Sequence, residues 1–452
     1  MLKENLQHKK EYDLRTDPVP KLFLHYSLLS IAGLSAMSIN IMLDGIFIGR
    51  FVGSMGLAAI NLVLPVFPIL LAIGMCFGYG AAALAGISFG RGDNKEANEI
   101  FNQAFWGVLI VSVLATVLME TFAEPIVTAL GATALLRDGV SIYFRTFTFF
   151  AGFFCLTLFF EPMVRNDGSP RKVMLSLILG ACTNACLDAL FIVGLGMGLF
   201  GAALATGLAQ VASCAYLLSH YGAGHGKLRF ARVSLSFSRI ITVFRTGCPA
   251  LATQICQALF IIIYNHAVLQ YMGELGVAAV GVILYMNELV MLCNYGFGEA
   301  LQPIASFNLG AAAHDRMRKT FYTAAGAALA VAGFLTIFIQ WIPGFFVGFF
   351  TREAELTALA VEGMRIYYGA LLVQSFNMVV IYYLGAVRRP LESTVLALIR
   401  NLGSFLAAIA ILPGLLGKLG VWLAIPAAEL LSFLFVCGVI FFNRFYFKGS
   451  RS

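Results

Sequence analysis

Twelve long apolar runs divide the chain, and they restrict its fold more than any other feature. A helix needs roughly 20 apolar residues to cross a bilayer. Only 12% of the 452 residues are charged, against about 25% in a soluble domain. The sequence therefore predicts an all-α membrane protein with twelve transmembrane helices. They lie near 22–48, 55–85, 99–120, 139–161, 173–194, 200–221, 246–270, 276–306, 320–342, 358–383, 393–413 and 420–442.

The two halves of the chain repeat one another. Residues 53–90 align with 273–310 at an offset of 220 without a gap, and Pro170 aligns with Pro390 at the same offset. An even number of helices per half makes the repeats parallel, which predicts two six-helix lobes related by pseudo-two-fold symmetry and suits alternating access. The predicted divisions are an N-terminal tail 1–20, a first lobe 21–222, a basic linker 223–245, a second lobe 246–442 and a C-terminal tail 443–452.

Basic residues are distributed unevenly between the two sides of the predicted membrane. If the N-terminus is cytoplasmic, 23 of the 30 Lys and Arg lie in cytoplasmic segments and four lie in outside loops. This asymmetry follows the positive-inside rule. We therefore expect a multi-pass protein of the cell membrane with both termini in the cytoplasm. The net charge of +7 is explained by topology, so no nucleic-acid partner is expected.

Two acids in the first half are candidates for binding a coupling ion. Asp188 lies deep in an apolar run, Asn184 precedes it by four residues on the same helix face, and Thr206 follows in the next helix. Asp44 lies toward the outer end of the first helix. An acid inside a membrane is costly and marks function, and carboxylates with an amide and a hydroxyl suit H⁺ or Na⁺. The equivalent positions of the second repeat carry Tyr264, Ser404 and Ala408.

Two further acids, Glu288 and Glu299, share a face of the eighth helix. They are eleven residues apart, about 16 Å along the axis. Tyr295 lies on that face and Tyr285 lies nearby. Carboxylates beside aromatic rings suit a lipophilic cation, so these residues are candidates for binding substrate. The alternative is that both acids hold helices together.

Two remaining acids fit structural roles better. Glu161 precedes Arg165 by four residues, a favourable helical pair. Glu429 lies in the last helix, where interhelical bonding is the favoured interpretation.

A short motif raises a different class of function. Gly86–Gly90 matches G-x-S-x-G around Ser88, which in hydrolases forms a nucleophile elbow between a strand and a helix. An intramembrane serine hydrolase is therefore one alternative. It is disfavoured because the motif ends a membrane helix and the repeat carries Asn308 in place of the serine.

Several motifs, in order and spacing, resemble the multidrug and toxic compound extrusion family, nearest to its bacterial MepA-type multidrug branch. The resemblance runs from about Pro20 to Asn443. It rests on LDGIFIGR (Leu43–Arg50), GLAAINLVLPV (Gly56–Val66), FGRGDNKEA (Phe89–Ala97), FEPMVRNDGSP (Phe160–Pro170), NACLDALFI (Asn184–Ile192), GAALAT (Gly201–Thr206) and PIASFNLGA (Pro303–Ala311).

This resemblance implies a secondary active exporter that antiports organic cations against H⁺ or Na⁺, without a cofactor and without enzyme activity. It places the coupling ion at Asp44, Asn184, Asp188, Thr206 and Tyr143. By the same resemblance, Glu288 and Glu299 correspond to substrate-binding acids. We expect a monomer. The alternative within related architectures is a lipid-linked oligosaccharide flippase, which would favour a strongly basic cavity.

Overall fold

The structure is a computed structural model. It describes all residues except 1–11, 64–65, 131, 133, 135, 223–225, 232, 349–352 and 443–452. The side chain of Tyr285, one of the predicted substrate residues, also lies outside the described part.

In the described residues of the first half, every regular element is a helix. Two of them continue into π-helical segments, named η1 and η3. The elements are α1 (Val19–Phe47), η1 (Ile48–Val52), α2 (Ser54–Val63), α3 (Phe67–Arg91), α4 (Asn94–Thr121), α5 (Ala123–Ala129), α6 (Arg137–Phe149), α7 (Ala151–Asn166), α8 (Pro170–Asp188), η3 (Ala189–Gly194) and α9 (Gly198–Gly222).

The second half follows the same plan. Its first element, α10, is two helices joined at Gly273, where the backbone leaves helical geometry (φ 68°, ψ −166°). The elements are α10 (Phe237–Gly310), α11 (His314–Trp341), α12 (Pro343–Val347), α13 (Ala354–Tyr367), η4 (Tyr368–Ala370), α14 (Leu371–Ala386), α15 (Pro390–Leu398), η5 (Ile399–Gly403), α16 (Ser404–Leu416) and α17 (Lys418–Phe442).

The predicted number of membrane spans is confirmed. Within the described residues, eleven helical stretches are long and apolar enough to cross a membrane, and the pair α6 and α7, bent by 46°, makes the twelfth. Each predicted apolar run overlaps one of these spans, but the run 55–85 begins within the separate helix α2, and its span is Phe67–Arg91. Helix α10 begins at Phe237, so the final part of the predicted linker is already helical; the assignment of 223–245 as a linker between lobes stays a prediction.

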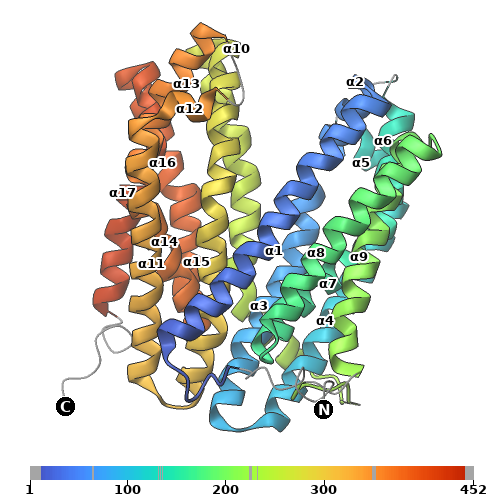
Figure 1. Ribbon diagram of the computed structural model, residues 1–452, viewed down its shortest axis with the longest axis vertical. Coiled ribbons are helices and arrows are strands. Elements are labelled where there is room, and N and C mark those ends of the chain that lie inside the picture. The colour runs from blue at the N-terminus through green and yellow to red at the C-terminus, as the bar shows by residue number, and fades with distance from the viewer. Residues whose placement is uncertain are drawn as a thin grey trace, which may run out of the picture.

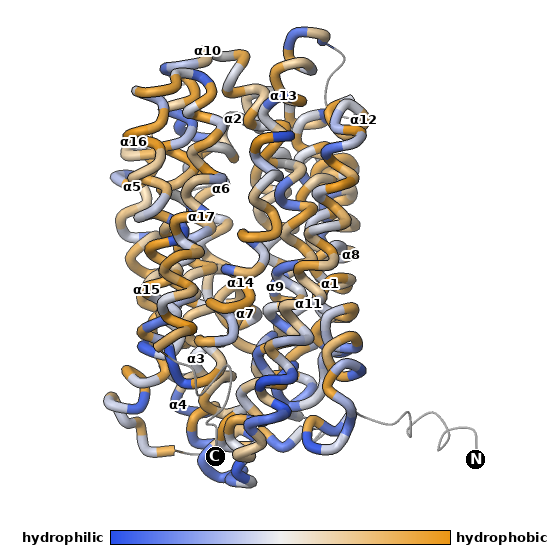
Figure 2. Tube along the Cα trace, turned by 90° about the vertical axis from the view of Figure 1, so that its left-hand side faces the viewer, coloured by the Kyte–Doolittle hydropathy of each residue, from blue (hydrophilic) through white to orange (hydrophobic). Residues whose placement is uncertain are grey.

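The helices form two groups that diverge toward one end of the molecule and meet at the other (Figure 1). Helix α1 begins and α17 ends at the end where the groups meet, which we call the terminal end; the other is the diverging end. Hydrophilic residues gather at the terminal end, and the middle of the bundle is mostly hydrophobic (Figure 2). This distribution is typical of a bundle whose central part faces lipid.

The two lobes are related by the predicted internal symmetry. Gly53 (φ 91°, ψ −176°) and Gly273 (φ 68°, ψ −166°), at the offset of 220, adopt the same unusual backbone conformation, which is essentially restricted to glycine. Pro170 and Pro390 each begin a helix, the position where proline's missing N–H costs least.

The lobes contact each other through matching residues of the two repeats. A Cβ on Gly90 would overlap the carbonyl oxygen of Phe307, and a Cβ on Gly310 would overlap that of Ile87. Gly310 and Phe307 lie 220 positions after Gly90 and Ile87, so each contact is the repeat-related copy of the other. This is the relation that a two-fold axis between α3 and the end of α10 requires. The absence of side chains lets the two helices approach closely, and this contact closes the terminal end.

Candidate ion and substrate sites

The two predicted acids of the first lobe are brought together by the packing of α1 against α8. The carboxyl groups of Asp44 and Asp188 lie within hydrogen-bonding reach of each other. One layer below them, the Asn40 amide donates to Asn184 Oδ1 at 2.6 Å. Both helices run in the same direction (Figure 1). Each carries an asparagine four residues before its aspartate, so an amide layer underlies a carboxyl layer.

Among the described residues, no Lys or Arg side chain pairs with the two acids. Asp188 is completely buried, and neither of its oxygens has a hydrogen-bond donor among the described residues. Asp44 Oδ1 and Asn40 Oδ1 are likewise buried without a donor. Buried polar atoms are nearly always satisfied. The Asn184 Nδ2 donor in the amide layer is also buried without a partner. Two adjoining buried carboxyls that receive no donor bond suit a proton or a small cation.

Tyr143 joins this group, whereas Thr206 does not make a bond to it. Tyr143, on α6, is 1% exposed and lies close enough to Asp44 and Asp188 to interact electrostatically with both. Its ring stacks on Phe147 with an interplanar angle of 9°. The hydroxyl of Thr206 donates instead to the carbonyl of Ala202 in its own helix, at 3.1 Å.

Sequence reasoning missed Asn40. The same spacing that drew attention to Asn184, four residues before an aspartate on one helix face, was available for Asn40 and Asp44. The irregular helix geometry was not visible in the sequence. The π segment η3 begins directly after Asp188, and η1 begins four residues after Asp44. Such segments frequently occur at functional sites.

The second lobe pairs Glu429, one of its buried acids, with an arginine. Arg400, in the π segment η5, binds Glu429 through two bonds: Nη2 to Oε1 at 2.7 Å and Nε to Oε2 at 3.0 Å. The Asn377 amide also donates to Glu429 Oε2 at 2.9 Å. The Glu429 side chain is 8% exposed. Its charge is neutralised within the protein, which agrees with the structural role predicted for it.

Glu299 takes part in an ion pair between the lobes. Its Oε2 accepts from Arg165 Nη2 at 2.7 Å, and its Oε1 accepts from the Tyr79 hydroxyl at 3.3 Å. Arg165 is 1% exposed. The prediction that Arg165 pairs with Glu161 was wrong in its choice of partner: Arg165 bonds to Glu299, and Glu161 lies only within electrostatic range. The prediction used only the spacing of residues within one helix, which gives no information about a partner in the other lobe.

Glu288 and Glu299, predicted to bind substrate together, lie in different surroundings. Glu288 is exposed and has no ion pair among the described residues. Tyr295 lies within electrostatic range of both Glu288 and Arg400. Glu288 is therefore free to meet a ligand in this conformation, whereas Glu299 is occupied by Arg165. The substrate-binding role of all three residues stays a prediction.

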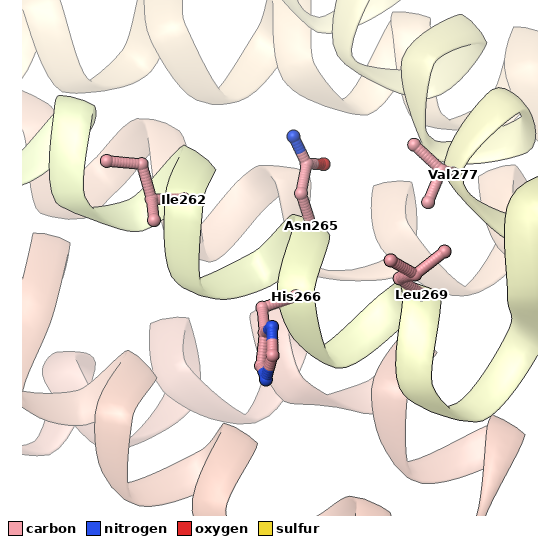
Figure 3. A pocket seen from close by; sticks show the side chains of 5 residues that line it. All are labelled: Ile262, Asn265, His266, Leu269 and Val277. Atoms are coloured by element: carbon pink, nitrogen blue, oxygen red, sulfur yellow. The ribbon is translucent and has the colours of Figure 1, made fainter. Parts of the chain in front are cut away.

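A separate cavity of about 450 Å³ lies on α10 beside the break at Gly273. It is lined by Ile262, Asn265, His266, Leu269 and Val277. Asn265 and His266 point in different directions in the close view (Figure 3). No carboxylate lines this cavity, so it offers no negative charge to an organic cation, and the acidic clusters remain the better candidates.

The motif around Ser88 lies inside a helix. Ser88 belongs to α3, and its hydroxyl donates to Glu96 Oε2 at 2.9 Å and is 3.2 Å from the Leu84 carbonyl. A nucleophile elbow needs a sharp turn after a strand. The helical backbone from Gly86 to Gly90 does not provide that turn. The match to G-x-S-x-G is therefore accounted for by close helix packing.

Together, the fold and these sites define a two-lobed polytopic α-helical membrane protein with an unpaired acidic cluster inside one lobe. The chain belongs to the MatE family. The family's sequence model matches it twice, over residues 30–190 and 249–409, one match in each lobe. The family resemblance predicted from the motifs is thereby confirmed.

Individual relatives agree over nearly the whole chain. It is 23% identical over 443 residues to the multidrug export protein MepA of Staphylococcus aureus (strain MSSA476), covering 97% of each chain. Its fold is similar to a crystal structure of MATE in complex with MaL6 (TM-score 0.90, 21% identity, 96% and 99% of the two chains). It is equally similar to an outward-facing multidrug resistance MATE family transporter of the MOP superfamily (TM-score 0.90, 21% identity, 96% and 98%).

Proposed function

We propose that this protein is a secondary active exporter of the cell membrane that exchanges a small organic cation for H⁺ or Na⁺. The observation that carries the proposal is the pair Asp44 and Asp188, held together inside the first lobe without a protein cation. The other deeply buried acids described above, Glu299 and Glu429, each bind an arginine. An acid left unpaired inside a membrane is expensive, and a transported ion is the expected reason for keeping it.

The acidic pair can bind either ion by its own chemistry. A single proton can be shared between the two carboxyl groups. Alternatively, the carboxylate oxygens supply the oxygen ligands that suit a hard cation such as Na⁺. Tyr143 closes one side of the site and excludes water from it. Thr206 is a more distant member, because its hydroxyl is used within its own helix.

The ion pair at the terminal end has a role in alternating access. Arg165, Glu299 and Tyr79 link the lobes where they meet, so opening this end requires the bonds to break. By the distribution of Lys and Arg, we place the terminal end in the cytoplasm and the diverging end outside. Opening would release Glu299 for a cationic substrate arriving from the cytoplasm, while Glu288 and Tyr295 remain available from the diverging end.

The test is ethidium transport by the purified protein in proteoliposomes under an imposed pH or Na⁺ gradient. The native protein should move ethidium under one of the two gradients, and Asp188→Asn should lose that movement. Asp138→Asn is the matched control, because Asp138 is exposed in the first turn of α6. Equal transport by the native protein and Asp188→Asn would contradict the role of Asp188.

The flippase alternative has less support. A flippase for an anionic lipid-linked sugar needs unpaired basic residues in its cavity. The two deeply buried arginines described above, Arg165 and Arg400, are both bound to glutamates. The hydrolase alternative lacks the local geometry described for Ser88. If ethidium does not move under either gradient, lipid-linked oligosaccharide transport is the next activity to measure, and Ser88→Ala separates the hydrolase from both.

A further inference from the structure

A second cavity, of about 340 Å³, lies at the terminal end where four parts of the chain meet. These parts are the segment before α1, the end of α3, the end of α10 and the residues that follow α9. Its lining includes Asp13, Arg15, Phe89, Arg91, Lys227 and Phe307. Three of these are basic and come from three different parts. None of them belongs to the proposed ion or substrate sites.

The segments that carry the basic residues are fixed by bonds of their own. Arg316 Nη2 donates to the carbonyl oxygens of Leu14 and Asp17, at 3.0 and 2.7 Å, which holds the segment before α1. The backbone N–H of Lys227 donates to Asp167 Oδ1 at 2.8 Å. Lys227 Nζ lies 5.6 Å from the centre of the Phe89 ring. The convergence of charges is therefore set by the backbone as well as by flexible side chains.

The neighbouring acids are already engaged. Asp13 accepts from the backbone N–H of Arg15 at 2.8 Å and from the Thr16 hydroxyl at 2.9 Å. The Arg15 N–H bond is the largest cause that lowers the pKa of Asp13, and attraction to Lys227 and Arg15 lowers it further, so Asp13 is ionised. Glu96 lies 3.8 Å from Arg91, and the same carboxylate oxygen accepts the Ser88 hydroxyl.

Asp13 and Glu96 offset part of this basic charge, because Asp13 attracts Lys227 and Arg15 and Glu96 lies 3.8 Å from Arg91. Three cations against two acids leave a net positive charge at the cavity, which favours a bound anion. We propose that this cavity binds a phosphate-bearing anion through Arg15, Arg91 and Lys227. Guanidinium groups match the geometry of phosphate oxygens, and a lysine adds a mobile point charge. The ligand is either the headgroup of an anionic phospholipid, which a basic cluster at the membrane surface attracts, or a free phosphate compound.

A bound anion would connect the two lobes at the terminal end. Arg91 ends α3 of the first lobe, and Phe307 belongs to α10, whose contact with α3 closes the terminal end. Arg15 lies on the segment that Arg316 ties to the start of α11. A ligand bound among them joins segments on both sides of that contact. It therefore favours the state in which the terminal end is closed.

The experiment measures the melting temperature of the purified full-length protein in a neutral detergent. One arm adds phosphatidylglycerol to the micelles, a second adds phosphatidylcholine, and a third adds inorganic phosphate against chloride at equal ionic strength. We expect a saturable rise of at least about 2 °C with phosphatidylglycerol or with phosphate. A rise with phosphatidylglycerol alone identifies a lipid headgroup as the ligand, and a rise with phosphate identifies a free anion.

The variant that tests the site is the triple change Arg15→Gln, Arg91→Gln and Lys227→Gln. These side chains are exposed, so the variant should fold and lose the rise. A matched triple control, Arg171→Gln, Arg318→Gln and Lys319→Gln, removes equal charge near the same end and should keep it. The proposal is overturned if neither ligand raises the melting temperature, or if the site variant and the control respond equally.

Discussion

The two lobes have the same architecture but treat their buried acids in opposite ways. In the first lobe, Asp44 and Asp188 lie side by side, and no described Lys or Arg pairs with them. In the second, Glu429 is bound by Arg400 at two atoms. A buried ion pair with good geometry is satisfied within the fold, whereas an unpaired acid depends on something from outside. The two lobes therefore share their backbone plan, but the charged partners of their buried acids differ.

The comparison predicts its largest effect at Asp188. Replacing Asp188 with Asn should remove at least about 90% of gradient-driven transport, because the amide can neither release a proton nor supply the negative charge that holds a cation. The melting temperature should stay the same or rise, since a buried unpaired carboxyl is exchanged for a neutral amide of the same shape. Ethidium flux in proteoliposomes and thermal unfolding of the same preparations measure both. A marked loss of stability would show that Asp188 is structural after all.

The opposite result is expected in the second lobe. Arg400→Met should destabilise the protein by about 3 kcal/mol or more, because Glu429 is left buried without its partner. The double variant Arg400→Met with Glu429→Met should recover most of the loss, since neither charge remains to be satisfied. Thermal unfolding in detergent compares the single and double variants. If the double variant is as unstable as the single one, the ion pair is not a closed structural unit.

Substitution of the repeat-related glycines Gly53 and Gly273 tests how similar the two lobes are. Gly53→Ala and Gly273→Ala should each cost about 2 kcal/mol, because both residues adopt backbone angles that side chains disfavour. Neither site has a heavy atom within 4 Å of an added Cβ, so the cost comes from the backbone alone. The two losses, measured by thermal unfolding, should agree within about 0.5 kcal/mol. Clearly unequal losses would show that the symmetry is approximate at these bends.

The smallest effect is expected at the edge of the ion site. Thr206→Ala should change coupled transport by less than about threefold, because its hydroxyl bonds to Ala202 and not to the carboxyls. Asn184→Ala is the informative comparison and should reduce transport more, since it removes the bond to Asn40 beneath the acids. Initial rates of ethidium movement separate the two. A larger loss for Thr206→Ala would restore Thr206 as a direct ligand.

Most residues of the candidate site could be predicted from the sequence, but their partners on other helices could not. The intramembrane acids were recognisable because each interrupts an apolar run, and Asn184 because it precedes Asp188 by one helical turn. What failed was the choice of partners between helices. Glu161 was the expected partner of Arg165, but Glu299 of the other lobe holds it. Asn40 was overlooked although the same spacing pointed to it.

The twelve spans, the two-lobed repeat and the family resemblance all follow from the amino-acid sequence alone. These depend on the length of apolar runs, on the distribution of charges and on an offset along the chain, all of which are one-dimensional quantities. Which of the buried acids are neutralised depends on the tertiary structure. In the sequence, Asp188, Glu299 and Glu429 look the same, because each is a single acidic residue within an apolar run. They differ because helix packing brings arginines from distant positions to Glu299 and Glu429, and brings another carboxyl to Asp188.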